Sequence, residues 1–329
     1  MITVCMLVFN GEKYLESAIK SILNQSFQDF ELLILDDGST DRSAQIVREI
    51  DSPKIRFLQN ARNQGLALAK HRALQEANRK YFAILDCDDW AYPNRLKEQV
   101  NFLEQHPKVA AVGSWVEVID GENNVKNTWN LPTKSEEIKV KMLFRNCFAH
   151  PSMMIRREIF NEFSYRNEYP PAEDYDLWSR ILQKYEMANL PKILIKYRVH
   201  GNNISQTKKE LLLENHYKIV GANLANLGIL PNENDLQNHK KIADLDFLDW
   251  EIAKNWLLKL RIANQKTQIY SQKDFDKELS FYWKELFLQN SPNFSLFSDW
   301  IFSEFSYKNG FLMFFRITLG TLFKIIKTK

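Results

Sequence analysis

The sequence has little glycine and little cysteine, and each shortage carries information. Only 10 of its 329 residues are glycine, about 3% where roughly 7% is typical. Each glycine is therefore expected to mark a turn or a close approach of the backbone. The three cysteines, Cys5, Cys87 and Cys147, include no C-x-x-C pair. This excludes a disulfide framework and a cysteine zinc site, and is typical of a reducing compartment.

An excess of charge and a long apolar run are also missing. The 44 Lys and Arg residues against 41 Asp and Glu residues leave a net charge of +3, which argues against an electrostatic binder of nucleic acid. No stretch reaches the ~18 uncharged apolar residues of a membrane span, and the first residues lack the basic start of a signal peptide. We therefore expect a cytoplasmic protein, with contact at the inner face of the cell membrane left open.

Apolar runs do alternate with segments of helical spacing over the first part of the chain. This alternation predicts an α/β fold, Rossmann-like, with a mostly parallel sheet flanked by helices. The expected strands are 2–9, 30–35, 54–59, 81–85, 109–119 and 192–199. The expected helices are 12–25, 43–50, 64–79, 93–105 and 174–184.

The pattern changes near residue 205. Eight of the ten prolines precede residue 200, and the remaining chain has helical spacing throughout. The helices expected there are 207–227, 235–265, 272–289, 296–307 and 311–327. We therefore predict a catalytic domain over residues 1–205 and a helical region over residues 206–329.

Polar clusters follow three of the expected strands. They are Asn10-Gly11, Asp36-Asp37-Gly38-Ser39 and Asp86-Cys87-Asp88-Asp89. In a parallel sheet the carboxyl ends of the strands meet at one edge, where ligands bind. Three carboxylates within four residues repel one another, and hard oxygen ligands suit Mg²⁺ or Mn²⁺. The alternative is that Asp88 and Asp89 cap the helix that begins near Pro93.

Eight short motifs in one order resemble the bacterial family 2 glycosyltransferases, enzymes of the GT-A fold. The resemblance covers roughly residues 1–205 and does not extend beyond them. The motifs are VFNGEKYL (8–15), SILNQSFQDFE (21–31), DDGSTD (36–41), NQGLA (63–67), DCDDW (86–90), HPS (150–152), EDYDLW (173–178) and YRVHGNN (197–203).

The resemblance implies a role for each candidate site residue. Asp174 would be the catalytic base that takes the proton of the acceptor hydroxyl, although acids at this position also suit a helix N-terminus. The residues implied in nucleotide binding are Leu7, Phe9, Asn10, Asp36, Asp37, Lys70 and Asp86. Those implied in metal binding are Asp88, Asp86, Asp89 and His200, with Mn²⁺ or Mg²⁺ as the ion. Those implied near the acceptor or the diphosphate are His150, Glu173, Trp178 and Arg198.

Two departures from the family pattern concern the donor site. Leu7 and Phe9 stand where the family usually has proline and tyrosine, so a tyrosine hydroxyl is missing from the base pocket. Lys70 stands where the family commonly has arginine, and lysine meets phosphate as a point charge rather than as a two-pronged donor.

The function implied is a metal-dependent, inverting glycosyltransferase. It would move a sugar from a nucleotide-sugar donor, expected to be a UDP-sugar, to a hydroxyl of a saccharide or lipid-linked acceptor in cell-surface polysaccharide synthesis. One alternative is a non-catalytic protein that binds nucleotide sugars. Another is a sugar nucleotidyltransferase, which would need a G-x-G-T-R loop that Asn10-Gly11-Glu12 does not supply.

Aromatic residues gather in the part that the resemblance does not cover. Residues 270–329 hold 16 of the 42 aromatic residues. On a helix near the end, Arg316, Lys324 and Lys327 would share one face, opposite a face rich in Leu and Phe. Such a helix is typical of a membrane interface, so we expect possible membrane contact through residues 311–329. A last helix packed on the catalytic domain is the alternative.

Overall fold

The structure is a computed structural model that describes residues 1–201, 203–246 and 248–289. The helices expected at 296–307 and 311–327, and with them the candidate membrane contact, lie outside these residues. The chain divides into two compact units. The first consists of residues 1–142 and 146–219, and the second consists of residues 143–145 and the chain from residue 220 onward.

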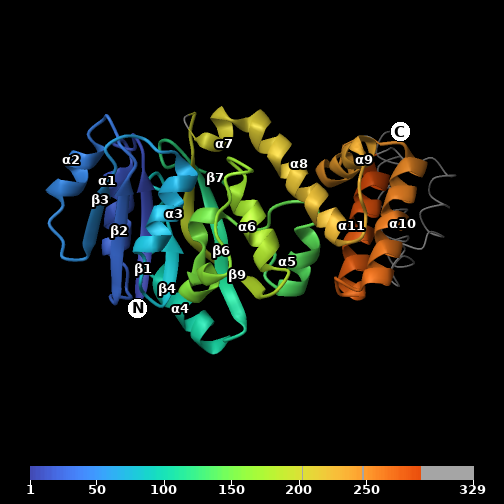
Figure 1. The fold of residues 1–329 in the computed structure, drawn as a ribbon, viewed down its shortest axis with the longest axis horizontal. Coiled ribbons are helices and arrows are strands. Elements are labelled where there is room, and N and C mark those ends of the chain that lie inside the picture. Colours follow the sequence, from blue (N-terminus) through green and yellow to red (C-terminus); the bar gives the residue numbers. More distant parts are fainter. Residues whose placement is uncertain (202, 247, 290–329) are drawn as a thin grey trace, which may run out of the picture. The chain divides into compact units, whose positions relative to one another are not determined.

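Within the described residues, nine strands of the first unit form one sheet in the order β3-β2-β1-β4-β8-β6-β9-β5, with β7 paired to β6 (Figure 1). Their bounds are β1 Ile2–Val8, β2 Phe30–Asp36, β3 Ile55–Gln59, β4 Tyr81–Ile84, β5 Trp90–Ala91, β6 Val109–Asp120, β7 Val125–Trp129, β8 Met154–Arg156 and β9 Glu186–Val199. Strands β1 to β4 pair in parallel, whereas β8 runs antiparallel to both β4 and β6.

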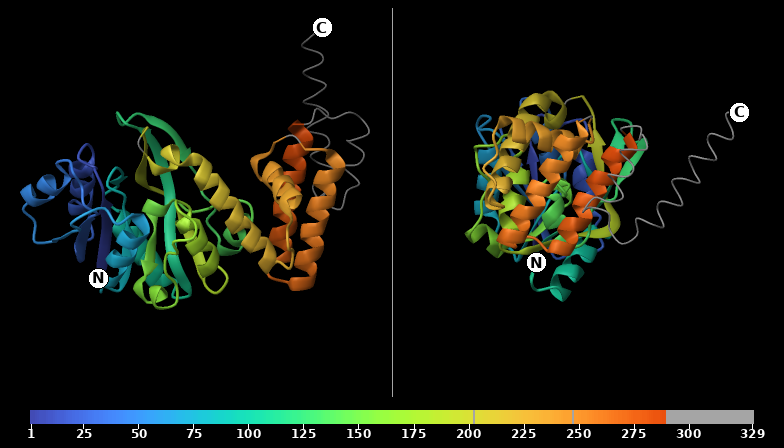
Figure 2. Two further views of the ribbon diagram at one scale, coloured as in Figure 1. Left: turned by 45° about the horizontal axis from the view of Figure 1, so that its top comes forward. Right: turned by 90° about the vertical axis from the view of Figure 1, so that its right-hand side faces the viewer.

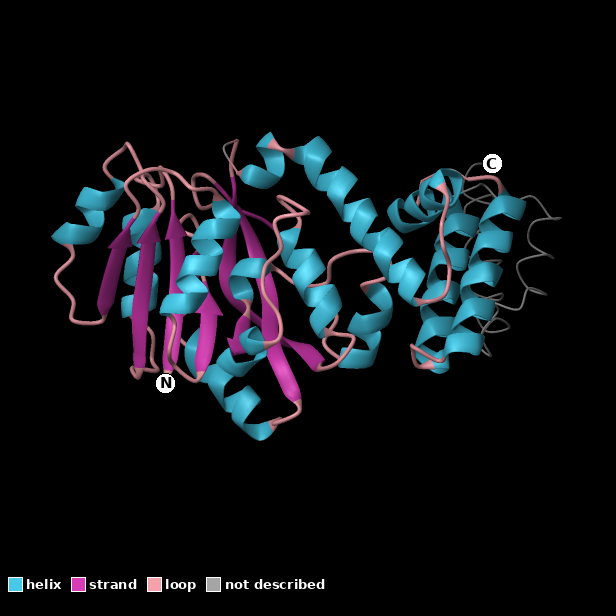
Figure 3. Cartoon of the chain, in the orientation of Figure 1, coloured by secondary structure: helices cyan, strands magenta, loops and turns pink. Residues whose placement is uncertain are grey.

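The helices follow the strands in an alternating order (Figure 3). Their bounds in the first unit are α1 Leu15–Leu23, α2 Ser43–Glu49, α3 Leu66–Glu76, α4 Arg95–Gln105, α5 Ser135–Lys141, α6 Glu173–Ile181 and α7 Ile204–Thr207, with short 3₁₀ helices at His150–Ser152 and Arg157–Asn161. Helix α8, Lys209–Asn226, begins in the first unit and ends in the second.

The pleat of β1 explains why helices cover both faces of this sheet. Its side chains alternate between the two faces. Ile2, Val4 and Met6 join the main core together with Leu15 and Ile19 of α1. By this alternation Cys5 and Leu7 face the opposite side, where Leu66 and Ala69 of α3 line the same cavity. Figure 2 shows the fold from two further sides. Because β1 has β2 on one side and β4 on the other, the carboxyl ends of β1 and β4 open a crevice. The α/β, Rossmann-like prediction is confirmed.

The expected strand at 192–199 is only the second half of a longer one. Strand β9 begins at Glu186 and pairs in parallel with β6, with register shifts along the pair. Pro191 lies at a shift in this register, where no ladder hydrogen bond is needed from it. The sequence pattern missed the first half because Pro191 interrupts the apolar run.

The second unit contains three further helices, α9 Glu233–Asp244, α10 Trp250–Thr267 and α11 Gln272–Gln289. The single helix predicted over 235–265 is wrong. Leu245 adopts a left-handed conformation with φ 59° and ends α9. Asp249 then caps α10 by accepting hydrogen bonds from the backbone N–H groups of Glu251 and Ile252. Among the described residues, no helix has both the length and the apolar character needed to cross a bilayer.

A buried histidine organises part of this unit. His239 is fully buried, and its Nδ1 accepts from the indole N–H of Trp256 at 3.1 Å. Its Nε2 therefore carries the proton and donates to the carbonyl of Leu143 at 3.0 Å. The ring also stacks on Phe144 at 4.7 Å between centroids. Residues 143–145 thereby belong to the second unit although their neighbours in sequence belong to the first.

Candidate active site

A cavity of about 1120 Å³ lies in the first unit at the carboxyl ends of β1 and β4. Eleven of the fifteen predicted site residues line it: Leu7, Phe9, Asn10, Asp37, Lys70, Asp86, Asp88, His150, Glu173, Asp174 and His200. The other four, Asp36, Asp89, Trp178 and Arg198, lie outside its lining. The topology thus brings together motifs that are up to about 190 residues apart in the chain.

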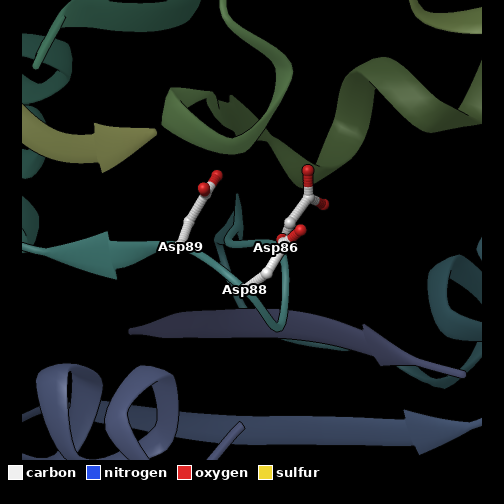
Figure 4. A group of neighbouring side chains, drawn as sticks. All are labelled: Asp86, Asp88 and Asp89. Carbon is white, nitrogen blue, oxygen red and sulfur yellow. The ribbon is translucent and has the colours of Figure 1, made fainter. Parts of the chain in front are cut away.

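An acidic cluster lies beside the cavity, on the turn that follows β4. Asp86, Asp88 and Asp89 each place one carboxylate oxygen within 4.8 Å of the others. Figure 4 shows the three side chains leaving this turn with their carboxylates on the same side. Burial and repulsion from Asp88 raise the pKa of Asp86 to about 7. The same two causes raise the pKa of Asp89 well above its usual range.

The β9 end and the residues after it hold this cluster in place. The backbone N–H of Arg198 donates to Asp89 Oδ1 at 2.7 Å, and its guanidinium donates to the backbone carbonyl of Asp88 at 2.8 Å. His200 Nε2 lies 3.0 Å from Asp88 Oδ2, and the Asn203 amide donates to the same oxygen at 3.1 Å. Arg198 therefore positions the turn from below the cavity rather than lining it.

The cluster fits a hard divalent cation. Clustered carboxylates with raised pKa values are costly without a positive charge between them. Asp89 Oδ2 is buried and has no hydrogen-bond partner within the described part of the chain. Carboxylate oxygens are the ligands that Mg²⁺ and Mn²⁺ prefer. Asp86 and Asp88 face the cavity, whereas Asp89 is only 2% exposed.

The Asp36-Asp37 turn after β2 ties two loops together. The Asp36 carboxylate accepts from the Ser39 backbone at 2.9 Å and is fully buried. The Asp37 carboxylate accepts from the Asn60 amide at 2.6 Å and from the backbone of Gly65 at 2.9 Å. Of the two acids, only Asp37 lines the cavity.

Position 38, next to Asp37, requires glycine because another stretch of backbone passes very close to it. A Cβ on Gly38 would come within 2.5 Å of the Arg62 backbone, and its φ of +76° also disfavours side chains. Phe9, at the end of β1, is 49% exposed beside this turn and lines the cavity. Such a ring offers a flat platform for an aromatic base.

The first turn of α6 carries a second group of acids that line the cavity, Glu173 and Asp174. Asp174 Oδ2 accepts from the side-chain amide of Asn146 at 3.0 Å. Asn146 Oδ1 accepts in turn from the backbone N–H of Phe148, which fixes the direction of the amide. Burial raises the pKa of Asp174 to about 6; repulsion from Glu173 adds to this rise and the Lys70 ammonium opposes it. Asp174 is thus a carboxylate that can both accept and release a proton near neutral pH.

Lys70 and Glu173 form a buried ion pair under the same turn. Their Nζ and Oε1 atoms are 2.6 Å apart, with exposed side-chain fractions of 9% and 3%. The Lys70 ammonium also lies over the ring of Tyr165, 4.9 Å from its centroid. The positive charge of Lys70 also lowers the pKa values of Asp86 and Asp174. Lys70 therefore offsets part of the negative charge of these two acids.

The two other residues predicted near the acceptor differ in their surroundings. His150 lines the cavity, and burial lowers the pKa of its imidazole well below the usual range, so the ring is neutral. Trp178 lies on the buried side of α6 and has no exposed surface. It packs edge to face with Phe148, at 6.2 Å between centroids, and acts as a core residue.

The sequence analysis did not single out several residues that line the cavity. Asn146 and Tyr165 lie in a segment of mixed pattern without a strand end to mark them. Asn203 was inside a family motif but received no role. Residues of α7, of α8 and of the link between them also line the cavity: Ile204, Ser205, Lys208, Leu212, Leu213 and His216. Their helical spacing was visible, but a spacing does not say which helix face meets a site.

Comparisons with known proteins agree with this geometry. The family model described as glycosyl transferase family 2 matches residues 3–164. An uncharacterized glycosyltransferase of Haemophilus influenzae is 30% identical over 236 residues, which cover 68% of this chain and 73% of that protein. The Escherichia coli protein named UDP-Glc:alpha-D-GlcNAc-diphosphoundecaprenol beta-1,3-glucosyltransferase WfgD is 30% identical over 215 residues, covering 64% of this chain and 82% of that protein.

A solved structure shares the fold. The crystal structure of Staphylococcus aureus TarS 1-349 in complex with UDP-GlcNAc aligns with a TM-score of 0.56 at 17% identity. The alignment covers 89% of this chain and 93% of that chain. At this identity the likeness concerns the fold alone.

Proposed function

The chain belongs to glycosyl transferase family 2, and from that premise we propose that it transfers a sugar from a UDP-sugar to an acceptor hydroxyl with inversion at the anomeric carbon. Members of this family are glycosyltransferases that use nucleotide sugars, and the fold here is the GT-A fold. Two similar proteins support a UDP-sugar as the donor. The name of WfgD contains UDP-Glc, and TarS was crystallised with UDP-GlcNAc. The acceptor in this proposal is a saccharide hydroxyl, with or without an attached lipid.

The observation that carries the proposal is the pairing of two acidic sites in one cavity. Asp86, Asp88 and Asp174 all line it, and Asp174 lies near enough to Asp86 for its negative charge to raise the pKa of Asp86. A donor whose diphosphate lies at the first site presents its anomeric carbon toward the second. No separate nucleophile is needed, because the acceptor hydroxyl attacks directly.

In this proposal the donor is held by the strand ends. Phe9 stacks against the base, and Asp37 accepts from its N–H. Asn10 and Leu7 complete the wall of that pocket, and Asp36 fixes the turn from behind. Lys70 offers its ammonium to the diphosphate while it remains beside Glu173.

A divalent cation, Mn²⁺ or Mg²⁺, would be held by Asp86 and Asp88, with His200 beside them and Asp89 behind. When bound, such an ion neutralises charge on the departing nucleoside diphosphate. Arg198 contributes by holding both the backbone of Asp88 and the carboxylate of Asp89. Between Asp88 and Asp89, we assign the main role to Asp88 because it faces the cavity.

Asp174 acts as the general base in this proposal. Its Oδ2 accepts from the Asn146 amide, and a carboxylate has further lone pairs with which it can accept from the acceptor hydroxyl. As that oxygen forms its bond to the anomeric carbon, its proton passes to Asp174 and the bond to the diphosphate breaks. One displacement on the face opposite the leaving group inverts the configuration, so an α-linked donor gives a β-linked product. The β-1,3 linkage in the name of WfgD supports this stereochemistry.

We place this reaction in the synthesis of cell-surface polysaccharide, as the names of the relatives suggest. Reduced cysteines and nucleotide-sugar donors both suit the cytoplasm, so we place the enzyme there. His150 and Glu173 lie beside the transferred sugar in this scheme, and Trp178 supports α6 from the core.

The experiment is a thermal-shift screen of UDP-Glc, UDP-GlcNAc, UDP-Gal and GDP-mannose, each with Mn²⁺, with Mg²⁺ and with a chelator. A ligand of the native state raises the unfolding temperature by mass action. We expect a UDP-sugar with a divalent ion to stabilise the wild type, and Asp88→Asn to lose this effect. Asp51→Asn, an exposed acid outside the cavity, serves as the control. Stabilisation by none of the donors, with or without metal, would overturn the proposed function.

A further inference from the structure

The ring of Tyr14 contacts two side chains that hold the acidic turn, and no step of the proposed reaction uses it. Tyr14 precedes α1 as its N-cap and lines the cavity. The guanidinium carbon of Arg198 lies 4.3 Å from the centroid of this ring, and the centroid of the His200 ring lies 5.3 Å from it. Arg198 holds the backbone of Asp88, and His200 lies beside the Asp88 carboxylate. Tyr14 is therefore next to both supports of this turn.

Arg198 is a buried cation whose guanidinium has no carboxylate partner. It is only 3% exposed, and within the described part of the chain its guanidinium forms no ion pair. Its Nε and Nη1 groups donate instead to the backbone carbonyls of Asp88 and Asp120, at 2.8 and 3.2 Å. A buried positive charge is costly without a negative partner, and the face of an aromatic ring supplies negative potential. The Tyr14 ring therefore stabilises Arg198 in the orientation that holds the Asp88 carbonyl.

The same ring restricts the imidazole of His200. The two rings are tilted by 38° to each other, and His200 Nε2 lies 3.0 Å from Asp88 Oδ2. A group that fixes the orientation of a side chain beside a metal ligand raises the affinity for the metal, because less freedom is lost on binding. Tyr14 thus keeps the imidazole directed at the Asp88 carboxylate.

The Tyr14 ring is itself fixed at both ends. Its hydroxyl donates to the carbonyl of Gly121 at 3.3 Å, in the turn between β6 and β7. A Cβ on Gly121 would come within 2.9 Å of this hydroxyl oxygen, so the approach depends on glycine. At the other end, the backbone N–H of Tyr14 donates to the carbonyl of Gly11 at 3.1 Å. The ring is therefore a rigid platform for Arg198 and His200.

From these contacts we propose that Tyr14 is a positioning residue for the divalent-cation site. It acts through Arg198 and His200, and the ion itself is held by the acids of the turn. This inference rests on the proposed function, because it concerns the cation that the same cavity would hold. The role requires the face of an aromatic ring, because an aliphatic side chain of similar volume offers no negative potential to a guanidinium.

The loss of this ring would release a positive charge beside the acidic cluster. Asp89 Oδ2 is buried and accepts no hydrogen bond from any described residue. Once the Arg198 guanidinium has lost its aromatic partner, it can turn toward this oxygen and form an ion pair. The pair would cancel negative charge that a cation needs, and it would end the hydrogen bond that holds the Asp88 carbonyl. Both changes weaken cation binding.

The test measures binding of Mn²⁺ to the full chain with saturating UDP, from the electron paramagnetic resonance signal of the free ion. Tyr14→Leu removes the aromatic face and should raise the Kd of Mn²⁺ roughly tenfold. Tyr14→Phe keeps the face and should bind Mn²⁺ within about threefold of the wild type. Pentafluorophenylalanine at position 14 keeps the shape of the ring and reverses the charge distribution of its face. It should therefore bind Mn²⁺ as weakly as Tyr14→Leu.

Tyr185 provides a matched control outside the cavity. The ammonium of Lys184 lies 5.4 Å from its ring centroid, and its hydroxyl donates to Glu162 at 2.6 Å. Tyr185→Leu therefore removes the same kinds of contact and should bind Mn²⁺ like the wild type. Binding of UDP in the presence of a chelator, measured by calorimetry, should be equal in all variants, because the proposed base pocket does not use Tyr14. Equal binding reports a folded donor site in each variant.

With a wild type that binds UDP and Mn²⁺, several results would overturn the inference and leave the proposed function untouched. They are an unchanged Kd of Mn²⁺ in Tyr14→Leu, an equal loss in Tyr14→Phe or in Tyr185→Leu, and a loss of metal-free UDP binding in Tyr14→Leu. Binding of Mn²⁺ to the pentafluorophenylalanine protein as tight as to Tyr14→Phe would also overturn it, and this comparison holds even if Tyr14→Leu does not fold. A wild type that binds neither UDP nor Mn²⁺ would instead overturn the proposed function.

Discussion

At the scale of single residues, the protonation of Asp174 is set by opposing neighbours. Burial and Glu173 favour the neutral acid, whereas Lys70 and Asn146 favour the carboxylate, and the resulting pKa is about 6. Because the base must be ionised to accept a proton, we expect kcat/KM to fall as the pH drops through about 6. A pH–rate profile checks this, and Asp174→Asn should remove transfer while retaining UDP binding. Transfer by that variant at the wild-type rate would contradict the role of Asp174.

Asn146 should shift that profile without touching the reacting atoms. Its amide donates to Asp174 Oδ2 and so favours the charged form. We expect Asn146→Ala to move the acidic limb of kcat/KM to higher pH, by roughly half a unit to one unit. Asn124 makes the same kind of bond to Asp120 outside the cavity, so Asn124→Ala is the matched control. A lower rate with an unmoved pH limb would mean that Asn146 only supports the loop.

The raised pKa of Asp174 also predicts that the ionised form needed for catalysis lowers the free energy of unfolding. An acid that titrates at about 6 in the fold and near 3.8 when unfolded keeps its full contribution to stability below pH 4. That contribution is lost as the pH rises through 6. Asp174→Asn should therefore raise the free energy of unfolding by about 1–2 kcal/mol at pH 8 and leave it unchanged at pH 4. Urea unfolding at the two pH values measures this, and an equal gain at both would contradict the explanation.

The candidate site could be predicted in part at this scale. Acids that follow apolar strands, such as Asp37 and Asp86, point to the cavity because parallel strands end at one edge of a sheet. Trp178 shares a motif and a helix face with Asp174, but it lies one turn further along α6 and is fully buried, which the motif alone does not show. Asn146 had no such signal, because its role depends on a contact 28 residues away in the chain.

At the scale of elements, the end of α10 gives a direct test of local conformation. Gln268 is exposed and adopts φ 53° where the helix ends, a conformation that favours glycine. Gln268→Gly should raise the free energy of unfolding by about 0.5–1 kcal/mol, because strain at a Cβ is removed. Gln265→Gly, inside the same helix and also exposed, should lower it by about 1 kcal/mol. Calorimetry of both variants checks the pair, and a loss of stability in both would contradict the assignment of the helix end.

The same helices show where sequence patterns fail. Apart from the two-residue β5, the strands and helices up to residue 105 were expected within a few residues of their bounds, because each apolar run is closed by polar or turn-forming residues. The break between α9 and α10 contains neither Gly nor Pro, so apolar spacing appeared to continue through it. Only Asp249, as an N-cap, marked the new helix.

At the scale of the whole molecule, the near-zero net charge conceals a division between acids and bases. The carboxylates of Asp86, Asp88 and Asp174 gather in the cavity, and Lys70, Arg198 and Lys208 lie around them. Composition alone argues against an electrostatic binder of nucleic acid, but it could not locate this site. The family motifs located it, and they end near residue 203, so the use of α7 and α8 as a wall had to come from the structure.

The division into two units makes a prediction about the whole chain. All described residues that line the cavity belong to the first unit. A UDP-sugar with Mn²⁺ at about 100 times its Kd should stabilise that unit by roughly 2.7 kcal/mol. For a unit of this size the unfolding temperature should rise by roughly 5–10 °C. The second unit, which holds α10 and α11, should unfold at an unchanged temperature.

Differential scanning calorimetry with and without the ligand measures this difference. The substitution Trp256→Phe identifies the transition of the second unit, because it removes the hydrogen bond from Trp256 to the buried His239. We expect Trp256→Phe to lower the unfolding temperature of the second unit and the ligand to raise that of the first unit. A ligand that raised both transitions equally would show that the units unfold as one body, because binding energy confined to the first unit would then stabilise the second as well.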